Sequence, residues 1–394
     1  MSNLSNAKIT RFREDKRLAV ISAIRSLSLV GLLITMVFCI FTYREDLNIT
    51  NIKRIISYID HVTFEGSQTD TFPFDAGLNT SYKAFDVGIA TCSGGSFRFI
   101  PPFENMDYSK QIKYSNPYMR VSGNSILVYD LGGTGISRLS SYSLLYETTL
   151  KSNILSLSAN LSGECSVITD EAGFRTALTV FDKRLKDVYK WQTSDHFAFL
   201  SALSPNAKTA AVLCIGQKDG ASDTYIRYQP TDGEECKITI DLGNRDVYSM
   251  EYYSNRLLMV LCEDGIYAYD NDGALKASAA FTSGSLVAFN HGAESLCAIS
   301  LKGTKGDSSD VKVFDGECKE IYSGTFDGDI RSIALSGSTL AFISGKELYK
   351  VDLASQAAEN VELSGVRDVL ITETGSVAAV YSDSAKIVSF EKGE

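Results

Sequence analysis

Three hydrophobic patterns follow one another along the chain. Residues 26–43 form an apolar run, SLSLVGLLITMVFCIFTY, with no charged side chain over 18 positions. Residues 44–60 then place apolar side chains at helical spacing, and from residue 61 onwards apolar and polar residues alternate with a period of two. These patterns predict one long apolar helix, one short amphipathic helix and a body of many short strands.

The apolar run is long enough to cross a bilayer, since about 20 apolar residues span its hydrocarbon core. It extends backwards to Leu18, with Arg25 placed where it could reach the headgroups. No small-x-small cleavage site follows it, so a removed signal peptide does not fit. We therefore predict an uncleaved transmembrane signal anchor over residues 18–43.

Charges on the two sides of the run predict its orientation. Residues 1–25 carry six basic and two acidic side chains, a net charge of +4, which leaves −14 for the rest of the chain. Positively charged flanks stay in the cytoplasm. We therefore expect residues 1–17 to be a cytoplasmic tail and the body to lie on the other side of the membrane.

Residues 44–60 are predicted to be an amphipathic stalk helix. Their apolar positions are Leu47, Ile52, Ile55, Ile56 and Ile59. This stripe would pack on the body, lie against the membrane or associate with a second copy, and the sequence leaves these alternatives open.

The body contains a repeated hexamer with an apolar fourth residue. Its copies begin 36 to 50 residues apart and occupy residues 71–76, 118–123, 154–159, 197–202, 247–252, 286–291, 330–335 and 366–371. A strongly apolar strand follows most of them, as at residues 257–262. The next strand ends in an apolar residue followed by aspartate, as in Phe181-Asp182 and Phe314-Asp315. We interpret these aspartates as acceptors in Asx-turns rather than as catalytic groups.

Four strands repeated about every 42 residues are typical of β-propeller blades. Seven units are complete, and the last supplies three strands before the chain ends. Residues 61–65 are predicted to fill the missing outermost place and so to close the ring. We predict an all-β, eight-bladed propeller over residues 61–394, with seven blades as the alternative.

The hexamers and the apolar-Asp turns resemble the WD40-like and quinoprotein-like propeller repeats of bacteria. The chain is most similar to uncharacterised single-pass bacterial membrane proteins with an exported propeller. That resemblance implies a bacterial cell-membrane location with the propeller extracytoplasmic. The Gly-His and Trp-Asp pairs of WD40 repeats are missing, since Trp191 is followed by Gln192.

The acidic body argues against nucleic acid as a partner, because phosphate binding needs a basic face. Five cysteines fall on predicted second strands, where a thiol packs as a small hydrophobic group: Cys92, Cys165, Cys214, Cys262 and Cys297. An odd number of cysteines outside the apolar run cannot pair fully. Unpaired thiols would suit a poorly oxidising surrounding, or a body that stays in the cytosol.

Candidate ligand-binding residues lie where the chain approaches each hexamer. Ligands of propellers usually bind at that end of the central channel. The charged or histidine side chains there are Arg120, Asp195, His196, Arg245, Asp246, Asp327, Asp329, Arg331, Arg367 and Asp368. They would bind a polar ligand or a charged peptide, or they would be turn residues and inter-blade ion pairs.

No motif for catalysis, a metal or a cofactor is found in the sequence. We therefore predict no catalytic residue, no metal site and no cofactor. The prediction is a membrane-tethered extracytoplasmic propeller that binds another envelope protein or a polar ligand as scaffold or sensor. A propeller hydrolase or lyase with acidic and arginine residues at the channel mouth is the alternative.

Overall fold

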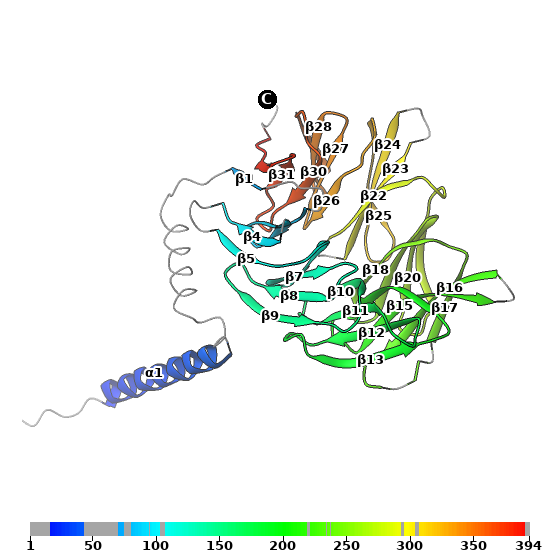
Figure 1. The fold of residues 1–394 in the computed structure, drawn as a ribbon. Coiled ribbons are helices and arrows are strands. Elements are labelled where there is room, and N and C mark those ends of the chain that lie inside the picture. Colours follow the sequence, from blue (N-terminus) through cyan, green and yellow to red (C-terminus); the bar gives the residue numbers. More distant parts are fainter. Residues whose placement is uncertain are drawn as a thin grey trace, which may run out of the picture. The chain divides into compact units, whose positions relative to one another are not determined.

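The structure is a computed structural model, and it describes residues 16–42, 70–74, 80–93, 95–102, 107–218, 221–233, 235–236, 238–292, 295–303 and 307–390. The chain divides into two compact units, Met1–Ser57 and Tyr58–Glu394. The first contains helix α1 (Lys16–Thr42), and the second contains the 32 strands of the described residues. Figure 1 shows the strands arranged as blades around a common axis.

The first four blades are four-stranded antiparallel sheets, each built from consecutive strands. Blade 1 consists of β2 (Ser81–Phe85), β3 (Gly88–Ser93), β4 (Ser96–Ile100) and β5 (Tyr108–Gln111). Blade 2 consists of β6 (Pro117–Ser122), β7 (Ser125–Asp130), β8 (Gly135–Leu139) and β9 (Leu144–Thr149). Blade 3 consists of β10 (Ile154–Ala159), β11 (Cys165–Asp170), β12 (Thr176–Phe181) and β13 (Asp187–Thr193). Blade 4 consists of β14 (Phe197–Leu203), β15 (Thr209–Lys218), β16 (Ala221–Pro230) and β17 (Ile238–Gly243).

The next three blades repeat this order. Blade 5 consists of β18 (Val247–Ser254), β19 (Leu257–Cys262), β20 (Gly265–Asp270) and β21 (Leu275–Ala280). Blade 6 consists of β22 (Leu286–Gly292), β23 (Leu296–Lys302), β24 (Ser308–Phe314) and β25 (Glu320–Asp327). Blade 7 consists of β26 (Ile333–Ser336), β27 (Thr339–Ser344), β28 (Glu347–Asp352) and β29 (Ala357–Glu362).

Blade 8 joins the two ends of the propeller. Its inner strands are β30 (Asp368–Ile371), β31 (Val377–Val380) and β32 (Ser384–Ile387), and its outermost strand is β1 (Thr71–Pro73). β1 pairs antiparallel with β32, with Phe72 opposite Ala385. The predicted eight blades are therefore confirmed. An N-terminal strand closes the ring, but it is Thr71–Pro73 and not the predicted residues 61–65.

The predicted strand assignments need correction at three places. The hexamer at residues 71–76 does not begin a blade, because its first three residues form the closing strand β1. The innermost strand of blade 1 is β2 instead, which the sequence did not single out. Residues 61–65, predicted to close the ring, lie outside the described residues. The hexamer at 330–335 is partly right, since β26 begins only at Ile333.

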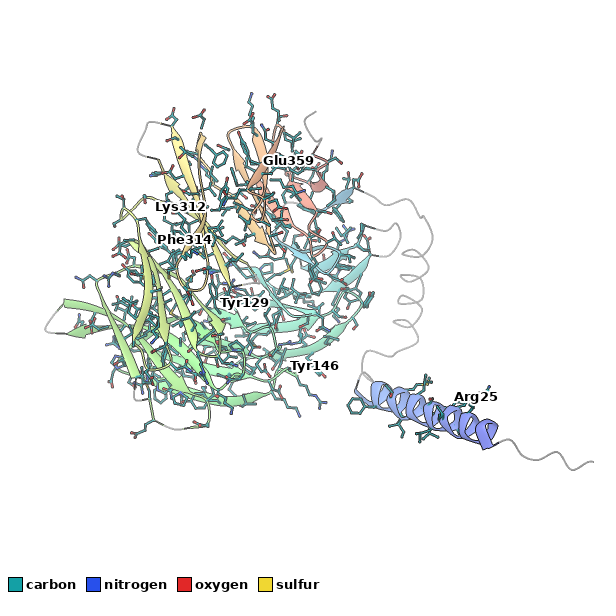
Figure 2. The ribbon with its side chains drawn as sticks, turned by 180° about the vertical axis from the view of Figure 1, so that it is seen from behind. Arg25, Tyr129, Tyr146, Lys312, Phe314 and Glu359 are labelled. Carbon is teal, nitrogen blue, oxygen red and sulfur yellow. The ribbon has the colours of Figure 1, made fainter. Side chains whose placement is uncertain are left out.

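The core is a ring of eight apolar clusters, one between each pair of neighbouring blades. Tyr129 belongs to the cluster between blades 2 and 3, and Phe314 to the cluster between blades 5 and 6 (both labelled in Figure 2). The second strand of each blade contributes side chains to the clusters on both sides of the blade, so it is buried on both faces. In β19, for example, every residue after Leu257 is buried. This confirms the predicted second strands.

The aspartates of the apolar-Asp turns accept backbone hydrogen bonds. Asp182 Oδ1 accepts from the amides of Arg184 (2.8 Å) and Lys186 (2.9 Å). Asp315 Oδ1 accepts from the amides of Glu317 and Lys319, both at 2.9 Å. At the equivalent turn, backbone N–H groups lower the pKa of Asp352. The interpretation of these aspartates as Asx-turn acceptors is confirmed.

Helix α1 covers 27 residues and includes most of the predicted apolar run. Among the residues that the structure describes, no helix has the length and apolar character needed to cross a membrane. Residues 1–15 of the predicted tail and the whole predicted stalk, residues 44–60, lie outside the described residues.

Replacing Phe72 should show how much the ring depends on β1. Phe72 is fully buried between blades 8 and 1, so Phe72→Ala should lower the free energy of unfolding by about 3 kcal/mol. Urea unfolding of the full chain, followed by circular dichroism, measures this loss. Pro73→Ala on the exposed side of the same strand is the control and should cost less than about 1 kcal/mol. Equal losses for the two variants would contradict a packed closing strand.

Candidate functional site

The propeller has two faces, and the innermost strands begin at one face and end at the other. Every blade repeats the same strand order, so all innermost strands begin at one face, here called the front face, and end at the other, the rear face. The predicted binding residues, apart from Arg120, lie at or near the front face.

Several of the predicted residues are held in local ion pairs. Arg331 pairs with Asp329 at 3.1 Å, and both side chains are strongly exposed. Arg245 Nε lies 2.9 Å from Asp264 Oδ2, and its guanidinium stacks over the Tyr267 ring at 5.0 Å. The hydrogen bond to Asp264 raises the pKa of Arg245. These charges are therefore already neutralised by neighbours in the same part of the chain.

Asp368 joins three blades. It accepts hydrogen bonds from the Tyr82 hydroxyl of blade 1 at 3.0 Å and from the Ser332 hydroxyl, which precedes β26 of blade 7. Ser332 Oγ also accepts the Val369 amide at 3.0 Å. Burial raises the pKa of Tyr82, and Asp368 raises it further. Asp368 thus serves as an inter-blade contact, the structural alternative that the sequence left open.

Arg120 lies in the middle of β6 and not in a front loop, which corrects its predicted position. It lies near Lys83, on the innermost strand of the neighbouring blade. The surrounding protein desolvates the Lys83 ammonium and lowers its pKa, and Arg120 lowers it further, whereas Asp368 raises it. Two like charges therefore lie close to each other near the axis.

The other predicted residues do not form one cluster. The His196 ring packs edge-on against Tyr225 at 5.3 Å, on the second hairpin of blade 4. The backbone carbonyl of Asp246 accepts the Glu263 amide, that of Asp327 accepts the Ser344 hydroxyl, and the Arg367 amide donates to Val380. No contact of Asp195 connects it to these groups in the described residues. In the described residues these contacts do not join the ten predicted residues into one cluster.

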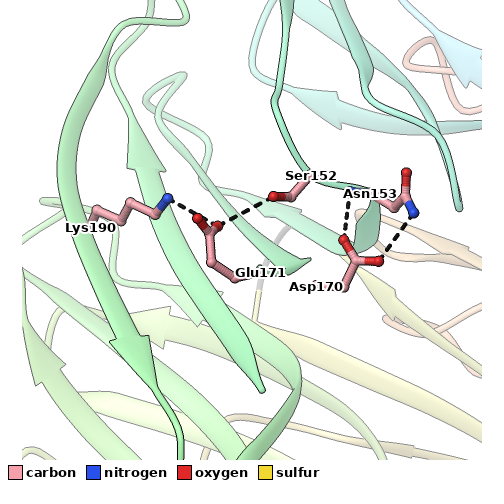
Figure 3. Close-up of polar contacts among 5 residues, drawn as sticks. All are labelled: Ser152, Asn153, Asp170, Glu171 and Lys190. Atoms are coloured by element: carbon pink, nitrogen blue, oxygen red, sulfur yellow. Dashed lines mark hydrogen bonds and ion pairs between the residues drawn. The ribbon is translucent and has the colours of Figure 1, made fainter. Parts of the chain in front are cut away.

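Asn–Asp contacts hold two of the front loops. The Asn153 amide donates to Asp170 Oδ1 at 2.7 Å, and Asn153 Nδ2 donates to Asp170 Oδ2 at 3.1 Å, as Figure 3 shows. In blade 2 the Asn116 amide donates to Asp130 Oδ1 at 2.8 Å. In each case an asparagine before the innermost strand is tied to the aspartate that ends the second strand. The sequence signal for this contact is the repeated pair of an Asn and an Asp, Asn116 with Asp130 and Asn153 with Asp170, at equivalent positions of two repeats.

The innermost strands expose aromatic side chains that the sequence analysis missed. We call them the aromatic lining: Tyr118, Phe197, Phe199, Tyr248 and Phe289, which are 37 to 46% exposed. They belong to blades 2, 4, 5 and 6. In blades 3 to 6 the pairing of the innermost strand shifts near its start, and Phe199 and Tyr248 are the extra residues of such bulges. A bulge re-aims a side chain, so simple alternation does not predict the exposure of Phe199 and Tyr248.

One protein family matches most of the chain. The model of a family of unknown function, DUF5711, matches residues 65–390, which cover the described propeller. The chain belongs to the DUF5711 family. No curated protein matches this DUF5711 chain.

Solved structures resemble the DUF5711 chain in fold. BamB from Moraxella catarrhalis is 15% identical with a TM-score of 0.51, and the match covers 83% of this chain and 98% of BamB. The C-terminal WD40 domain of Sif2 is 12% identical with a TM-score of 0.57 and coverages of 83% and 99%. The Dos1 propeller is 10% identical with a TM-score of 0.56 and coverages of 83% and 97%. At these identities the likeness shows the propeller fold alone.

The cysteines of the DUF5711 propeller are unpaired. The five that were predicted on second strands lie on β3, β11, β15, β19 and β23 and are buried. Burial raises the pKa of the thiols of Cys92, Cys165, Cys214, Cys262 and Cys297 to about 12, which makes them poor nucleophiles. In the described part of the chain, no three His, Cys, Asp or Glu side chains are grouped to hold a metal ion.

The Asn153–Asp170 contact of the DUF5711 propeller can be tested by substitution. Asp170→Ala removes both acceptors and should lower the free energy of unfolding by about 1 kcal/mol. Glu171→Ala is the matched control: Glu171 pairs with a half-exposed Lys190 at 3.0 Å and accepts a long hydrogen bond from Ser152 at 3.4 Å, so its loss should cost less than about 0.5 kcal/mol (Figure 3). Chemical denaturation of both variants gives the two values. A larger loss for Glu171→Ala would show that the Asn–Asp contact does not hold the loop.

Proposed function

We propose that this DUF5711 propeller is a binding module for another protein and that it binds through the aromatic lining. The observation that carries the proposal is the exposure of five aromatic rings on innermost strands of four blades. Exposed apolar residues are ordinary when they are scattered singly, but when they gather on one feature of a soluble domain they mark contact surfaces. Aromatic residues are enriched among those that dominate binding energy.

The distribution of exposed apolar residues supports this choice of surface. Apart from Val121 on β6, the other large exposed apolar side chains among the described residues of the propeller lie on turns and outer strands, such as Leu275 on β21 and Val188 on β13. Near the axis, by contrast, Phe197 and Phe199 lie 5.0 Å apart between ring centroids. Rings held on strands lose little conformational freedom when a partner covers them.

Neighbouring charges would orient the partner rather than supply most of its affinity. The Arg331–Asp329 and Arg245–Asp264 pairs flank the front face and are partly or fully exposed. Exposed charges of this kind mainly influence the rate and the geometry of association. The net charge of −14 outside residues 1–25 favours a partner with a basic surface.

Site-specific photo-crosslinking in cells tests this proposal. A benzoylphenylalanine residue placed at Phe199 or Tyr248 of the full chain should give a discrete adduct with one protein. The same residue at Leu275 or Val188 is the control and should give none. Phe199→Ser combined with Tyr248→Ser should then weaken binding of the purified adduct partner at least about tenfold, a loss of about 1.4 kcal/mol. Equal labelling at inner and outer strands would refute the assignment of this surface.

We further propose that the apolar run at residues 18–43 tethers the propeller to a bacterial cell membrane, with the propeller extracytoplasmic. The proposal rests on the uncharged stretch of 18 residues and on the excess of basic residues before it. The large apolar side chains from Ile24 to Phe38 on α1 are exposed, as expected for a helix that needs an apolar surrounding.

Fractionation and a reporter test this location. The full chain should stay with the membrane pellet after carbonate washing, whereas a chain with Leu33→Arg and Val37→Arg should move to the supernatant. Alkaline phosphatase fused after Glu394 should be active, because it folds only outside the cytoplasm. An inactive phosphatase together with a fluorescent cytoplasmic reporter at the same position would contradict the orientation.

A further inference from the structure

The rear face contains a cavity of about 290 Å³ that the proposed function does not use. Five blades contribute to it, at or beyond the ends of β6, β10, β14, β18 and β22. One water molecule occupies about 30 Å³, so the cavity has room for a small organic group. It lies at the opposite end of the innermost strands from Phe197 and Tyr248 on the front face.

Hydrogen bonds between turns make the wall of this cavity rigid. They connect blades 2, 3 and 4, then blades 4 and 5, and then blades 5 and 6. The bonds run from Ser122 Oγ to the Asn160 carbonyl (2.6 Å), from Asn160 Nδ2 to the Ser204 carbonyl (3.0 Å), from the Asn206 amide to Asn255 Oδ1 (2.9 Å) and from Ser295 Oγ to the Tyr253 carbonyl (3.1 Å). A ligand therefore meets a preorganised site and orders little of the chain on binding.

His291 contributes a fixed, uncharged group to the wall. Its Nε2 lies 2.7 Å from Ser249 Oγ, and its Nδ1 lies 2.9 Å from the Tyr253 hydroxyl. Burial lowers the pKa of His291, while Glu251 raises it and Arg120 lowers it. The net shift is downward, so the imidazole is neutral at pH 7 and does not balance a negative charge beside it.

Glu251 is the one charged side chain among the described residues that line the cavity. It is exposed, and no hydrogen bond or ion pair with another described residue engages its carboxylate. Arg120 precedes the lining residue Val121, but it forms no ion pair with Glu251 in the described residues. The remaining lining includes apolar groups such as Val121, Ala202 and Leu203. The cavity thus combines a free carboxylate with a surface suited to an aliphatic chain.

We propose that the Glu251 cavity binds the cationic end of an alkylguanidinium or alkylammonium group. The carboxylate would pair with the cation, and Val121, Ala202 and Leu203 would contact the aliphatic stem. Apolar surfaces of proteins cover the stems of arginine and lysine side chains in the same way. A carboxylate and a guanidinium form two parallel hydrogen bonds, which favours guanidinium over a neutral isostere. Phe289 of the aromatic lining packs against His291 in the cavity wall, with 5.9 Å between ring centroids. Glu251, Val121, Ala202 and Leu203 do not belong to the aromatic lining, so either proposal can fail without the other.

Isothermal titration of the full chain with butylguanidinium tests the site. Saturable binding with a Kd of about 1 mM or tighter is expected, together with at least tenfold weaker binding of the uncharged butylurea. Glu251→Gln keeps the shape but removes the charge and should weaken butylguanidinium binding at least tenfold. Val121→Trp should do the same by filling the cavity. Circular dichroism confirms that each variant is folded.

Glu263→Gln is the control, because Glu263 accepts a hydrogen bond from Ser283 at the front face and should leave binding unchanged. No saturable binding by the parent chain would overturn the proposal, and so would undiminished binding by Glu251→Gln. An Arg-containing tripeptide with blocked ends identifies the source of the cation. Binding about tenfold tighter than that of butylguanidinium assigns the site to an arginine of a polypeptide, and equal binding assigns it to a free small cation.

Discussion

Apolar packing between neighbouring blades is the interaction on which the rest of the structure depends. Each blade is a sheet of four short strands that cannot bury both its faces alone. Eight apolar clusters between the blades bury these faces, and each cluster needs residues from two blades. The eighth cluster needs Phe72 and Phe74, which come from the other end of the sequence. The ring is therefore complete only when a segment before blade 1 packs into blade 8.

The closed ring gives its two faces different chemistry. Innermost strands of four blades expose aromatic rings, two of them, Phe199 and Tyr248, at bulges near the strand starts. At the opposite face, hydrogen bonds connect the turns beside Glu251. Several charges that the sequence suggested as ligand groups make contacts within the fold. Asp368, for example, binds hydroxyl groups of two other blades. The proposed ligand-binding groups are the exposed rings and Glu251.

The sequence predicts what depends on local periodicity. The second strands, the eight blades and the aspartates of the turns could all be predicted, because burial on both faces and Asx-turn geometry leave repeated marks on each unit. The assignment of residues 71–76 failed, because Thr71–Pro73 and a true innermost strand have the same apolar pattern, and only the distant β32 decides between them. The aromatic lining was missed for a different reason. A bulge adds one residue and changes which side chains face the axis, as at Phe199 and Tyr248.

If the propeller is one closed ring, its closing strand is held as firmly as its other strands. Amide hydrogen exchange measures this directly. The Phe74 amide, which donates to the Asp383 carbonyl, and the Ile387 amide, which donates to the Asp70 carbonyl, should be protected as strongly as amides of β15 in blade 4. Exchange of these two amides by local opening, many times faster than in β15, would contradict a closed ring.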